Sequence, residues 1–527
     1  MLPALLCAGC LAGGIWGPRV EAADASEGPG QTVSSFTKAY ALVEQNFAEP
    51  LNADASIYKG AIPGMLRTLD PHSNFFDPRD YQILREDQRG HYYGVGMQVG
   101  ARNGMTVVIA PFPGSPAYKA GLRPGDTIET VDSKPVAHLS TTEVADLLKG
   151  DRGSPVTITV ARVGAADPLK FDLVRDEIQR KSVEDPFWVE PGIAYVRILQ
   201  FGEGTGKELE DGLKRLGEGN INGLILDLRD NPGGLLNEGV AVADHFLAKS
   251  QLIVSQHGRA SAERPYVARE GNHGRDYPIV ALVNRGTASA AEIVSGSLQD
   301  HDRAWIMGEI TFGKGLVQTV FPLQEGTGLA LTTAHFYTPS GRLIQRDYTN
   351  KPFYEYYYNR AGMRQDPSDV KTTDGGRTVY GGGGITPDQK YETPKMDSLE
   401  SELYRDGLFE FTRSYFSKHS TDLPKDWMPS ADTVEDLHDF LLSKGRQFTE
   451  AQFTTDHDWI ERNLAREMYT TAFNVDVATQ MFDKTDPEVH RAVEAMPQAE
   501  ALLKASQKTV ARREAARPSA SEAAAVK

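Results

Sequence analysis

Three glycine-bearing stretches in the middle of the chain hold residue types that could carry out chemistry. Residues 227–234, Asp-Leu-Arg-Asp-Asn-Pro-Gly-Gly, follow a predicted buried strand, so their glycines leave backbone N–H groups able to face an anion. Residues 284–292 also follow a strand and open a helix, with Ser289 at the helix start. The helix dipole and free N–H groups there would stabilise a nucleophile's negative charge. Serine is equally a common N-cap, so Ser289 alone does not decide between the two roles.

The third stretch, residues 308–318, approaches the phosphate-loop pattern Gly-x-x-x-x-Gly-Lys, which ends here at Lys314. The next residue is Gly315 in place of the Ser or Thr that would hold Mg²⁺, which argues against nucleotide binding. Ser35 and Lys38 have the spacing of a β-lactamase-type pair, but the companion S-D-N and K-T-G motifs are missing. We interpret that pair as surface residues.

Lys314 has the neighbours that a lysine base would need. An exposed lysine has a pKa of about 10.4 and is protonated at pH 7, so it cannot accept a proton there. Burial disfavours the ammonium form and lowers the pKa. Phe312, Leu316 and Val317 surround Lys314 in the sequence, which favours such burial.

The elements around these stretches alternate between strand and helix patterns. Buried strands are predicted at 193–198, 223–228 and 279–283, and helices at 235–247 and 290–298. This alternation predicts an α/β core with parallel pairing over residues 179–395. Before it, Phe36, Tyr40, Val43 and Phe47 recur at helical spacing, which predicts a helical N-terminal unit over 24–87. After it, we expect a helical C-terminal extension over 396–510 and an unstructured tail over 511–527.

Residues 88–178 consist of short predicted strands separated by glycines. The series Pro-Gly-Ser-Pro-Ala at 113–117, Ala-Gly-Leu at 120–122 and Pro-Gly-Asp at 124–126 resembles a PDZ domain. Any one of these glycines alone would indicate only a turn. The resemblance implies that a peptide adds as a strand to the sheet edge. Its free carboxylate would bind backbone N–H groups of the loop Tyr93, Gly94, Val95 and Gly96.

Taken together, the three stretches resemble the C-terminal processing peptidases, also called tail-specific proteases. The resemblance includes Leu-Asp-Pro-His-Ser at 69–73, Tyr-Thr-Pro-Ser-Gly-Arg at 337–342 and Gly-Ile-Thr-Pro-Asp at 384–388. It implies that Ser289 is the nucleophile, that Lys314 is the general base and that Gln318 holds the lysine. It further implies that the backbone N–H groups of Gly233 and Ala290 form the oxyanion hole. The implied fold is multidomain α+β, with a PDZ domain ahead of an α/β crotonase-like (ClpP/crotonase) peptidase core.

The function implied by the resemblance is that of a serine endopeptidase needing no cofactor or metal. It would recognise unstructured C-terminal tails of proteins through its PDZ domain and cleave near them. Within hydrolases, the alternative is a Ser–His–Asp triad that uses His301 or His335 with Asp300 or Asp302. From another class, the alternative is a catalytically silent PDZ scaffold. That alternative requires Ser289 or Lys314 to be missing or misplaced, and neither is missing.

The net charge limits the kinds of partner that we expect, and the first 23 residues indicate where we expect the protein to be located. Of the 527 residues, 56 are Lys or Arg and 72 are Asp or Glu, and the formal net charge of −16 argues against nucleic acid as a partner. Apolar residues 2–16 suit a signal peptide (1–23) better than a span of about 20 residues. Both cysteines, Cys7 and Cys10, lie there, so cleavage would leave no cysteine for catalysis or disulfides. We expect an exported protein, periplasmic or in the cell envelope, with Cys10 as a less favoured lipid anchor and no membrane insertion of the mature chain.

Overall fold

The computed structural model describes residues 29–52, 54–349, 351–358 and 366–515. The chain divides into two compact units, Met1–Leu69 and Asp70–Lys527. The predicted signal peptide, with Cys7 and Cys10, lies outside the described residues. Within the described residues no helix is both long enough and apolar enough to cross a membrane.

The first unit is helical, as predicted. It contains α2 (Pro29–Asn46), a π-helix (Asp54–Ala61) and α3 (Ile62–Leu66). Its predicted end at residue 87 is wrong, because the second unit begins at Asp70. The reason is a strand pairing that local patterns do not show: β1 (Asn74–Phe76) joins β18 (Gly328–Tyr337) of the second unit.

The PDZ-like part of the second unit is a small β-sheet with two helices. The sheet has the order β3-β4-β5-β7-β8, with β6 added to β5. Before it, α4 (Pro78–Arg89) leads into β2 (His91–Gly94), which pairs with β9 (Asp176–Gln179). The remaining bounds are β3 Met97–Arg102, β4 Met105–Pro111, α5 Pro116–Ala120, β5 Thr127–Val131, β6 Lys134–Pro135, α6 Thr141–Leu148, β7 Pro155–Ala161 and β8 Leu169–Val174.

The α/β core is a six-stranded sheet in the order β10-β11-β12-β15-β16-β21. Its strands are parallel except for β10, so their carboxyl ends meet at one edge. The alternation predicted from the sequence is confirmed for the strands and the helices. The bounds are β10 Phe187–Glu190, β11 Ile193–Arg197, α7 Thr205–Leu216, β12 Gly223–Asp227, α8 Leu236–Asp244, β15 Ile279–Val283, α9 Ala290–Asp300, β16 Trp305–Gly308 and β21 Gln389–Lys390.

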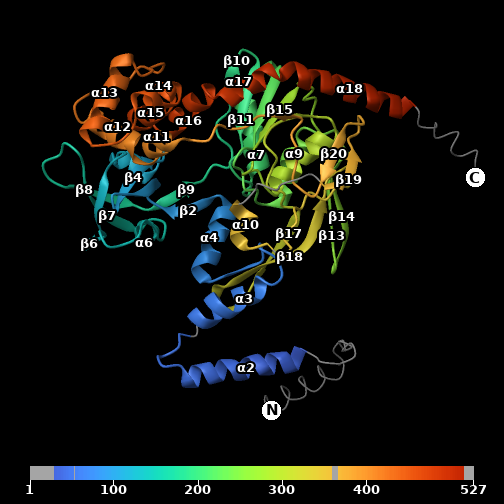
Figure 1. The fold of residues 1–527 in the computed structure, drawn as a ribbon, viewed down its shortest axis with the longest axis horizontal. Helices are drawn as coiled ribbons and strands as arrows, with labels where there is room; N and C mark the ends of the chain where they lie inside the picture. Colours follow the sequence, from blue (N-terminus) through green and yellow to red (C-terminus); the bar gives the residue numbers. More distant parts are fainter. Residues whose placement is uncertain (1–28, 53, 350, 359–365, 516–527) are drawn as a thin grey trace, which may run out of the picture. The chain divides into compact units, whose positions relative to one another are not determined.

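A second, antiparallel sheet completes the core. Its order is β1-β18-β13-β14, and β17 pairs with β18 (Figure 1). This sheet matters for the site because Lys314 lies just before β17 and Gln318 lies within it. The bounds are β13 Leu252–Gly258, β14 Ser261–Val267 and β17 Leu316–Pro322, followed by α10 Phe353–Tyr358 and the hairpin β19 Asp366–Thr372 with β20 Thr378–Gly381.

The C-terminal region is helical, as predicted, but it extends further than expected. The last helix, α18, runs from Met496 to Ala515, so the predicted start of the tail at 511 is wrong. Residues 511–515, Ala-Arg-Arg-Glu-Ala, are good helix formers and prolong α18. The earlier helices are α11 Ser398–Glu402, η4 Leu403–Gly407, α12 Leu408–Phe416, α13 Ala431–Ser443, α14 Glu450–Thr455, α15 His457–Ala472, α16 Val475–Lys484 and α17 Pro487–Glu494.

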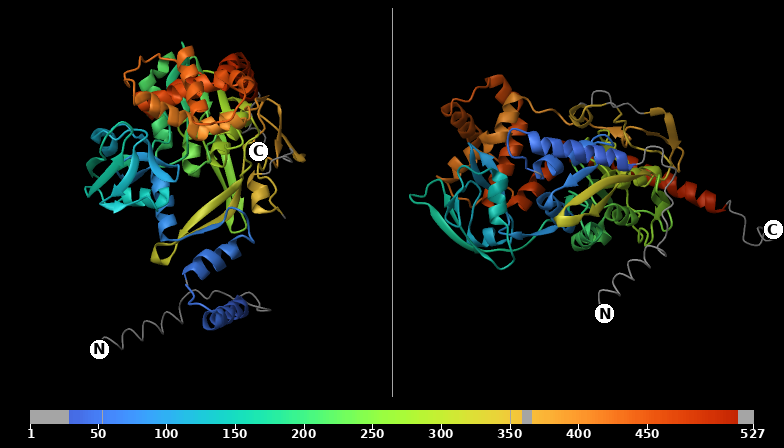
Figure 2. Two further views of the ribbon diagram at one scale, coloured as in Figure 1. Left: turned by 60° about the vertical axis from the view of Figure 1, so that its left-hand side comes forward. Right: turned by 90° about the horizontal axis from the view of Figure 1, so that it is seen from below.

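These C-terminal helices (orange to red in Figures 1 and 2) contact both other parts of the second unit. On the PDZ-like side, Arg102 lies 3.5 Å from Asp406 and its guanidinium stands 5.5 Å from the Phe409 ring centroid. On the core side, Val489 and Ala492 of α17 are buried in one apolar cluster with the core sheet. The region therefore packs as part of the second unit.

Candidate active site

Ser289 stands at the start of α9 in a strained backbone conformation. Its φ of 55° and ψ of −115° are uncommon for a residue with a side chain. Its N–H donates to Glu292 Oε2 at 2.9 Å, and its carbonyl accepts from the Glu292 N–H at 2.8 Å. Every residue of α9 is buried. The helix thus holds the serine from inside the core, at the edge where the parallel strands end.

Glu292 connects the serine segment to the lysine segment. Its carboxylate is fully buried and accepts four hydrogen bonds. Oε2 accepts from the Ser289 and Lys314 N–H groups, both at 2.9 Å, and Oε1 accepts from the Gly313 N–H at 2.7 Å and Thr311 Oγ1 at 2.5 Å. Burial raises the pKa of Glu292, and these hydrogen bonds oppose the rise. The sequence analysis did not identify Glu292, although Ser-x-x-Glu at a helix start is a capping-box signal.

Lys314 is largely buried, and its amine is bound by Gln318. Its Nζ donates to Gln318 Oε1 at 2.9 Å, and Gln318 Nε2 donates to the His72 carbonyl. Burial lowers the pKa of Lys314, while the negative charges of Glu292 and Asp70 oppose the shift. The lysine therefore has the environment that a neutral amine base requires.

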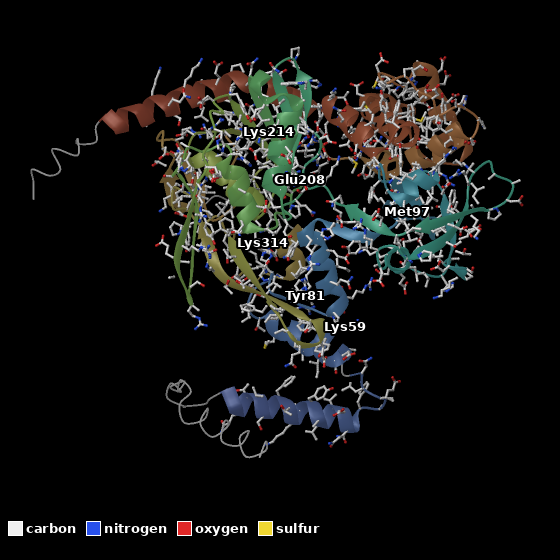
Figure 3. The ribbon with its side chains drawn as sticks, turned by 180° about the vertical axis from the view of Figure 1, so that it is seen from behind. Lys59, Tyr81, Met97, Glu208, Lys214 and Lys314 are labelled. Atoms are coloured by element: carbon white, nitrogen blue, oxygen red, sulfur yellow. The ribbon has the colours of Figure 1, made fainter. Side chains whose placement is uncertain are left out.

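Ser289, Lys314 and Gln318 line one cavity of about 500 Å³. Figure 3 labels Lys314, which lies just before β17. Within the described part of the chain, no hydrogen bond joins Ser289 Oγ to Lys314 Nζ, so the two groups share a cavity without direct contact. The rest of the cavity wall is mainly apolar and includes Leu84, Phe201, Leu235, Leu236, Ile293, Leu316, Val317, Val320, Ala330 and Phe336.

Both predicted oxyanion donors also line this cavity, but only one of their N–H groups is open. In the described residues the N–H of Ala290, at the first position of α9, has no hydrogen-bond partner. The Gly233 N–H instead donates to Asn231 Oδ1 at 2.8 Å. Gly233 has φ 94°, and a Cβ there would lie 2.7 Å from Ser289 Cβ, so only glycine fits this close approach.

His72 also lines the cavity, which the sequence analysis did not foresee. Its ring nitrogens are hydrogen-bonded to Tyr356 (2.9 Å) and Tyr357 (3.1 Å) of α10. Burial, with the nearby charge of Lys314, lowers the pKa of His72 to about 3, so the ring is neutral at physiological pH. The ring and its carbonyl therefore help to build the wall against which Lys314 and Gln318 rest.

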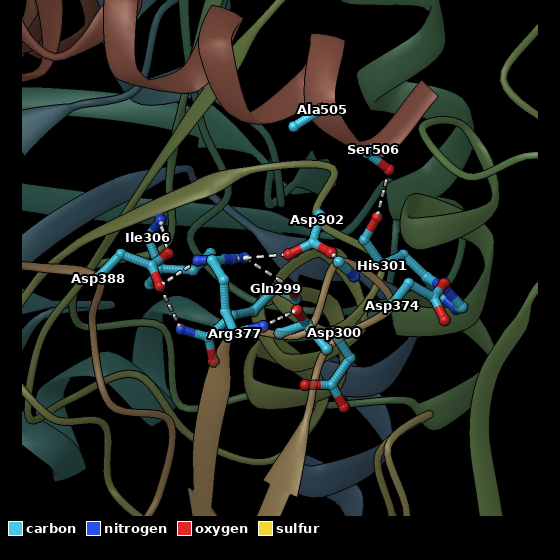
Figure 4. A network of polar contacts seen from close by, with 12 residues as sticks. Gln299, Asp300, His301, Asp302, Ile306, Asp374, Arg377, Asp388, Ala505 and Ser506 are labelled. Carbon is cyan, nitrogen blue, oxygen red and sulfur yellow. Dashed lines mark hydrogen bonds and ion pairs between the residues drawn. The ribbon is translucent and has the colours of Figure 1, made fainter. Parts of the chain in front are cut away.

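The two other histidines considered in the sequence lie elsewhere. His301 caps the opposite end of the helix that begins after Ser289, about 18 Å away at 1.5 Å per residue. Its ring is bound by Asp374 and the Leu252 carbonyl, both at 2.7 Å, in the network of Figure 4. His335 lies in β18 opposite His257 of β13. Neither lines the cavity, so this geometry does not support a Ser–His–Asp triad that uses His301 or His335.

Asp300 and Asp302, the carboxylates considered for that triad, are already paired with arginines. Asp300 is paired with Arg342 at 2.7 Å, and both aspartates are buried. Asp302 is paired with Arg377 at 2.7 Å (Figure 4). These pairs hold the end of α9 to the chain around residues 342 and 377. Among the residues that the structure describes, no three His, Cys, Asp or Glu side chains gather so as to hold a metal ion.

In the described residues, the loop Tyr93–Gly96, which the resemblance assigns to a tail carboxylate, has two bound carbonyls and two N–H groups without a partner. The carbonyls of Val95 and Gly96 are occupied, since they accept from the Ala117 N–H (2.9 Å) and Ser115 Oγ (2.7 Å). No partner for the N–H groups of Val95 and Gly96 is found in the described ranges. Both residues are buried, while Tyr93 is exposed. The β3 strand that follows is an edge strand, which leaves room for an added peptide strand.

Comparisons with known proteins agree with this architecture. A model of peptidase family S41 matches residues 192–351, and a PDZ-domain model matches residues 107–162. A carboxy-terminal-processing protease of Bartonella bacilliformis is 40% identical over 296 residues, which cover 55% of this chain and 68% of that protein. A carboxyl-terminal-processing protease of Synechocystis sp. is 37% identical over 311 residues, covering 58% and 72%. The solved structure of a photosystem II D1 C-terminal processing protease is 30% identical, covers 69% and 87%, and has a TM-score of 0.36.

Proposed function

Because this chain belongs to the carboxy-terminal processing proteases, and is thus a serine-type protease with a PDZ domain, we propose that it cleaves near unstructured protein tails by a Ser–Lys acyl-enzyme mechanism. The observation that carries this proposal is the position of Lys314. It is a buried amine with a lowered pKa, lining one cavity with Ser289 and bound by Gln318.

In the proposed reaction, neutral Lys314 Nζ takes the proton of the Ser289 hydroxyl as Oγ attacks the scissile carbonyl. The oxyanion is stabilised by the Ala290 N–H at the start of α9, and by the Gly233 N–H once it leaves Asn231 Oδ1. The Lys314 ammonium then gives its proton to the leaving amine, which leaves an ester on Ser289. Water attacks the ester carbonyl while Lys314 accepts its proton. The bond between the acyl carbon and Oγ then breaks, the acyl fragment leaves as a carboxylic acid, and Lys314 returns the proton to Oγ, which restores the Ser289 hydroxyl.

Recognition is assigned to the PDZ domain. The open N–H groups of Val95 and Gly96 would receive the tail's carboxylate, and the tail would pair with β3. We also propose that the chain is exported through the apolar segment 2–16, to the periplasm or cell envelope. Nucleic acid, metal and organic cofactors have no part in the proposed function.

A silent tail-binding scaffold is the second candidate. It is favoured by the missing Ser289–Lys314 hydrogen bond within the described chain and by the Gly233 N–H that is already bound. An unstructured protein with a free C-terminus, incubated with the wild type and with Ser289→Ala, separates the two. We expect fragments only with the wild type, and none after treatment with a serine-reactive phosphonate. Binding without fragments would establish the scaffold.

A further inference from the structure

The turn that carries Gly233 is joined to the C-terminal helices through Arg229. All three nitrogens of the Arg229 guanidinium are bound by carboxylates. Nε and Nη2 donate to Asp227, at distances of 2.5 to 3.0 Å. Nη1 donates to Asp486 Oδ2 at 2.9 Å and to Glu488 Oε2 at 2.8 Å. Asp486 and Glu488 belong to the start of α17, far outside the peptidase-family match at 192–351.

Arg229 is bound by more carboxylates than are needed to neutralise its single positive charge. Asp227 alone gives Arg229 a bidentate, neutral pair, so two further carboxylates add a desolvation cost. The side chain of Glu488 is only 3% exposed. Burial raises the pKa of Glu488 to about 7, although Arg229 opposes the shift. Both α17 carboxylates bind Nη1, the nitrogen that Asp227 does not bind, so they fix the direction in which the guanidinium points.

The orientation of Arg229 matters because the residues after it lead directly to the nucleophile. Asp230 has φ 58° and is fixed by Asn284, through its N–H and its carboxylate, both at 2.9 Å. The Asn231 carbonyl accepts from the Ala288 N–H at 2.9 Å. Gly233 lies against Ser289 with no room for a Cβ. A shift at Arg229 would thus move the oxyanion turn relative to Ser289.

Helix α17 is itself firmly placed. Asp486 is its N-cap and accepts from the Glu488 N–H at 2.8 Å through Oδ1, which leaves Oδ2 for Arg229. Val489 and Ala492, on the next turns, are fully buried in the apolar cluster of the core sheet. The carboxylates are therefore presented to Arg229 by a packed support.

We infer that Asp486 and Glu488 are positioning residues of the peptidase site, which act through Arg229 on the turn 230–234. The C-terminal helical region is then part of the catalytic apparatus as well as of the fold. The expected loss of kcat rests on the proposed peptidase function, whereas the expected change in the turn 230–234 does not.

The test is the double variant Asp486→Asn/Glu488→Gln in the full chain, with Glu488→Gln alone as a milder change. Misplacement of an active-site group by about 1 Å costs up to about a hundredfold in rate, so we expect kcat to fall about tenfold to a hundredfold. KM should stay within about twofold, because no PDZ contact is altered. Amides of 229–234 should exchange hydrogen faster while the remaining core amides keep their protection.

A matched control lies in the same helical region. Glu402 binds Arg446 at 2.9 Å, and Glu410 shares that arginine, but neither touches the core turn. Glu402→Gln should leave kcat and the exchange of 229–234 unchanged. The inference would be overturned if the double variant had the kcat of the wild type and the same hydrogen exchange at 229–234, with circular dichroism showing that the variant is folded. If the wild type cleaves nothing, the proposed function fails, and the exchange of 229–234 still decides this inference.

Discussion

The catalytic cavity and the PDZ loop both offer backbone N–H groups to an anion, but they treat these groups differently. In the cavity, the Gly233 N–H is held by Asn231 and the Ser289 N–H by Glu292. In the PDZ loop, the carbonyls of Val95 and Gly96 are bound and their N–H groups have no partner in the described residues. The loop N–H groups are thus unpaired among the described residues, whereas the N–H groups of Gly233 and Ser289 in the cavity are already hydrogen-bonded within the protein.

In the proposed function, this difference indicates that tail binding and peptide cleavage have different structural requirements in this chain. A tail would, in that function, bind N–H groups that have no partner in the described residues, so no existing hydrogen bond of these groups has to break. Cutting needs Ser289 Oγ to meet Lys314 Nζ and the Gly233 N–H to exchange its partner. We therefore expect variants of the cavity to affect turnover much more than they affect tail binding.

The largest effect is expected for Lys314→Arg. Arginine keeps the positive charge but cannot lose its proton at any workable pH, so it cannot act as a base. Because a general base contributes about 100- to 10,000-fold, kcat/KM should fall by that factor, as for Lys314→Ala. Tail binding, measured by fluorescence anisotropy, should be unchanged. Near-wild-type turnover by folded Lys314→Arg would defeat the Ser–Lys mechanism.

Glu292→Gln should have the next largest effect. Glutamine has an NH₂ group in place of one carboxylate oxygen, and this group would face two of the four N–H or O–H groups that now donate to Glu292. Each buried donor that loses its acceptor costs about 1–3 kcal/mol. We expect a lower melting temperature and a loss of kcat of about a hundredfold, because Ser289 and Lys314 would lose their common anchor. Glu309→Gln, which changes a pair with the half-exposed Arg285, is the matched control. Equal kcat in the two variants would show that Glu292 does not organise the site.

The PDZ side of the comparison is tested by amidating the tail. A tail amide lacks the charge that the Val95 and Gly96 N–H groups would bind, and hydrogen bonds to charged groups contribute about 1.5–3 kcal/mol. The Kd of an amidated peptide for Ser289→Ala should therefore rise about tenfold or more. Acid and amide peptides of equal affinity would place the carboxylate elsewhere.

The smallest expected effect is the change of kcat/KM with pH. Since burial lowers the pKa of Lys314 below its ordinary 10.5, kcat/KM should rise with pH as the ammonium loses its proton, and level off above that lowered pKa. The slope is at most about tenfold per pH unit for one proton. His72, with a pKa of about 3, stays neutral from pH 5 to 9 and should add no step. A pH-independent rate across that range would contradict a titrating lysine base.

The sequence predicted those features that depend on nearby residues. The apolar runs at 223–228 and 279–283 became β12 and β15, and Leu316 and Val317, close to Lys314 in the sequence, line the same cavity as that lysine. The features it did not predict depend on distant partners. Glu488 is 259 residues from Arg229, and His72 reaches Gln318 across 246 residues. Local periodicity carries no information about such contacts, and the strand Asn74–Phe76 was missed for the same reason.

The backbone of Ser289 has a consequence for the protein's stability. Its φ of 55° is tolerated far better by glycine, and such strain costs about 1–3 kcal/mol. Ser289→Gly should therefore melt at a higher temperature than Ser289→Ala, which differential scanning calorimetry can measure; equal melting temperatures would show that the turn carries no strain. In the proposed function, the substitution that relieves this strain also removes the nucleophile, so a gain in stability at this position would come with a loss of cleavage.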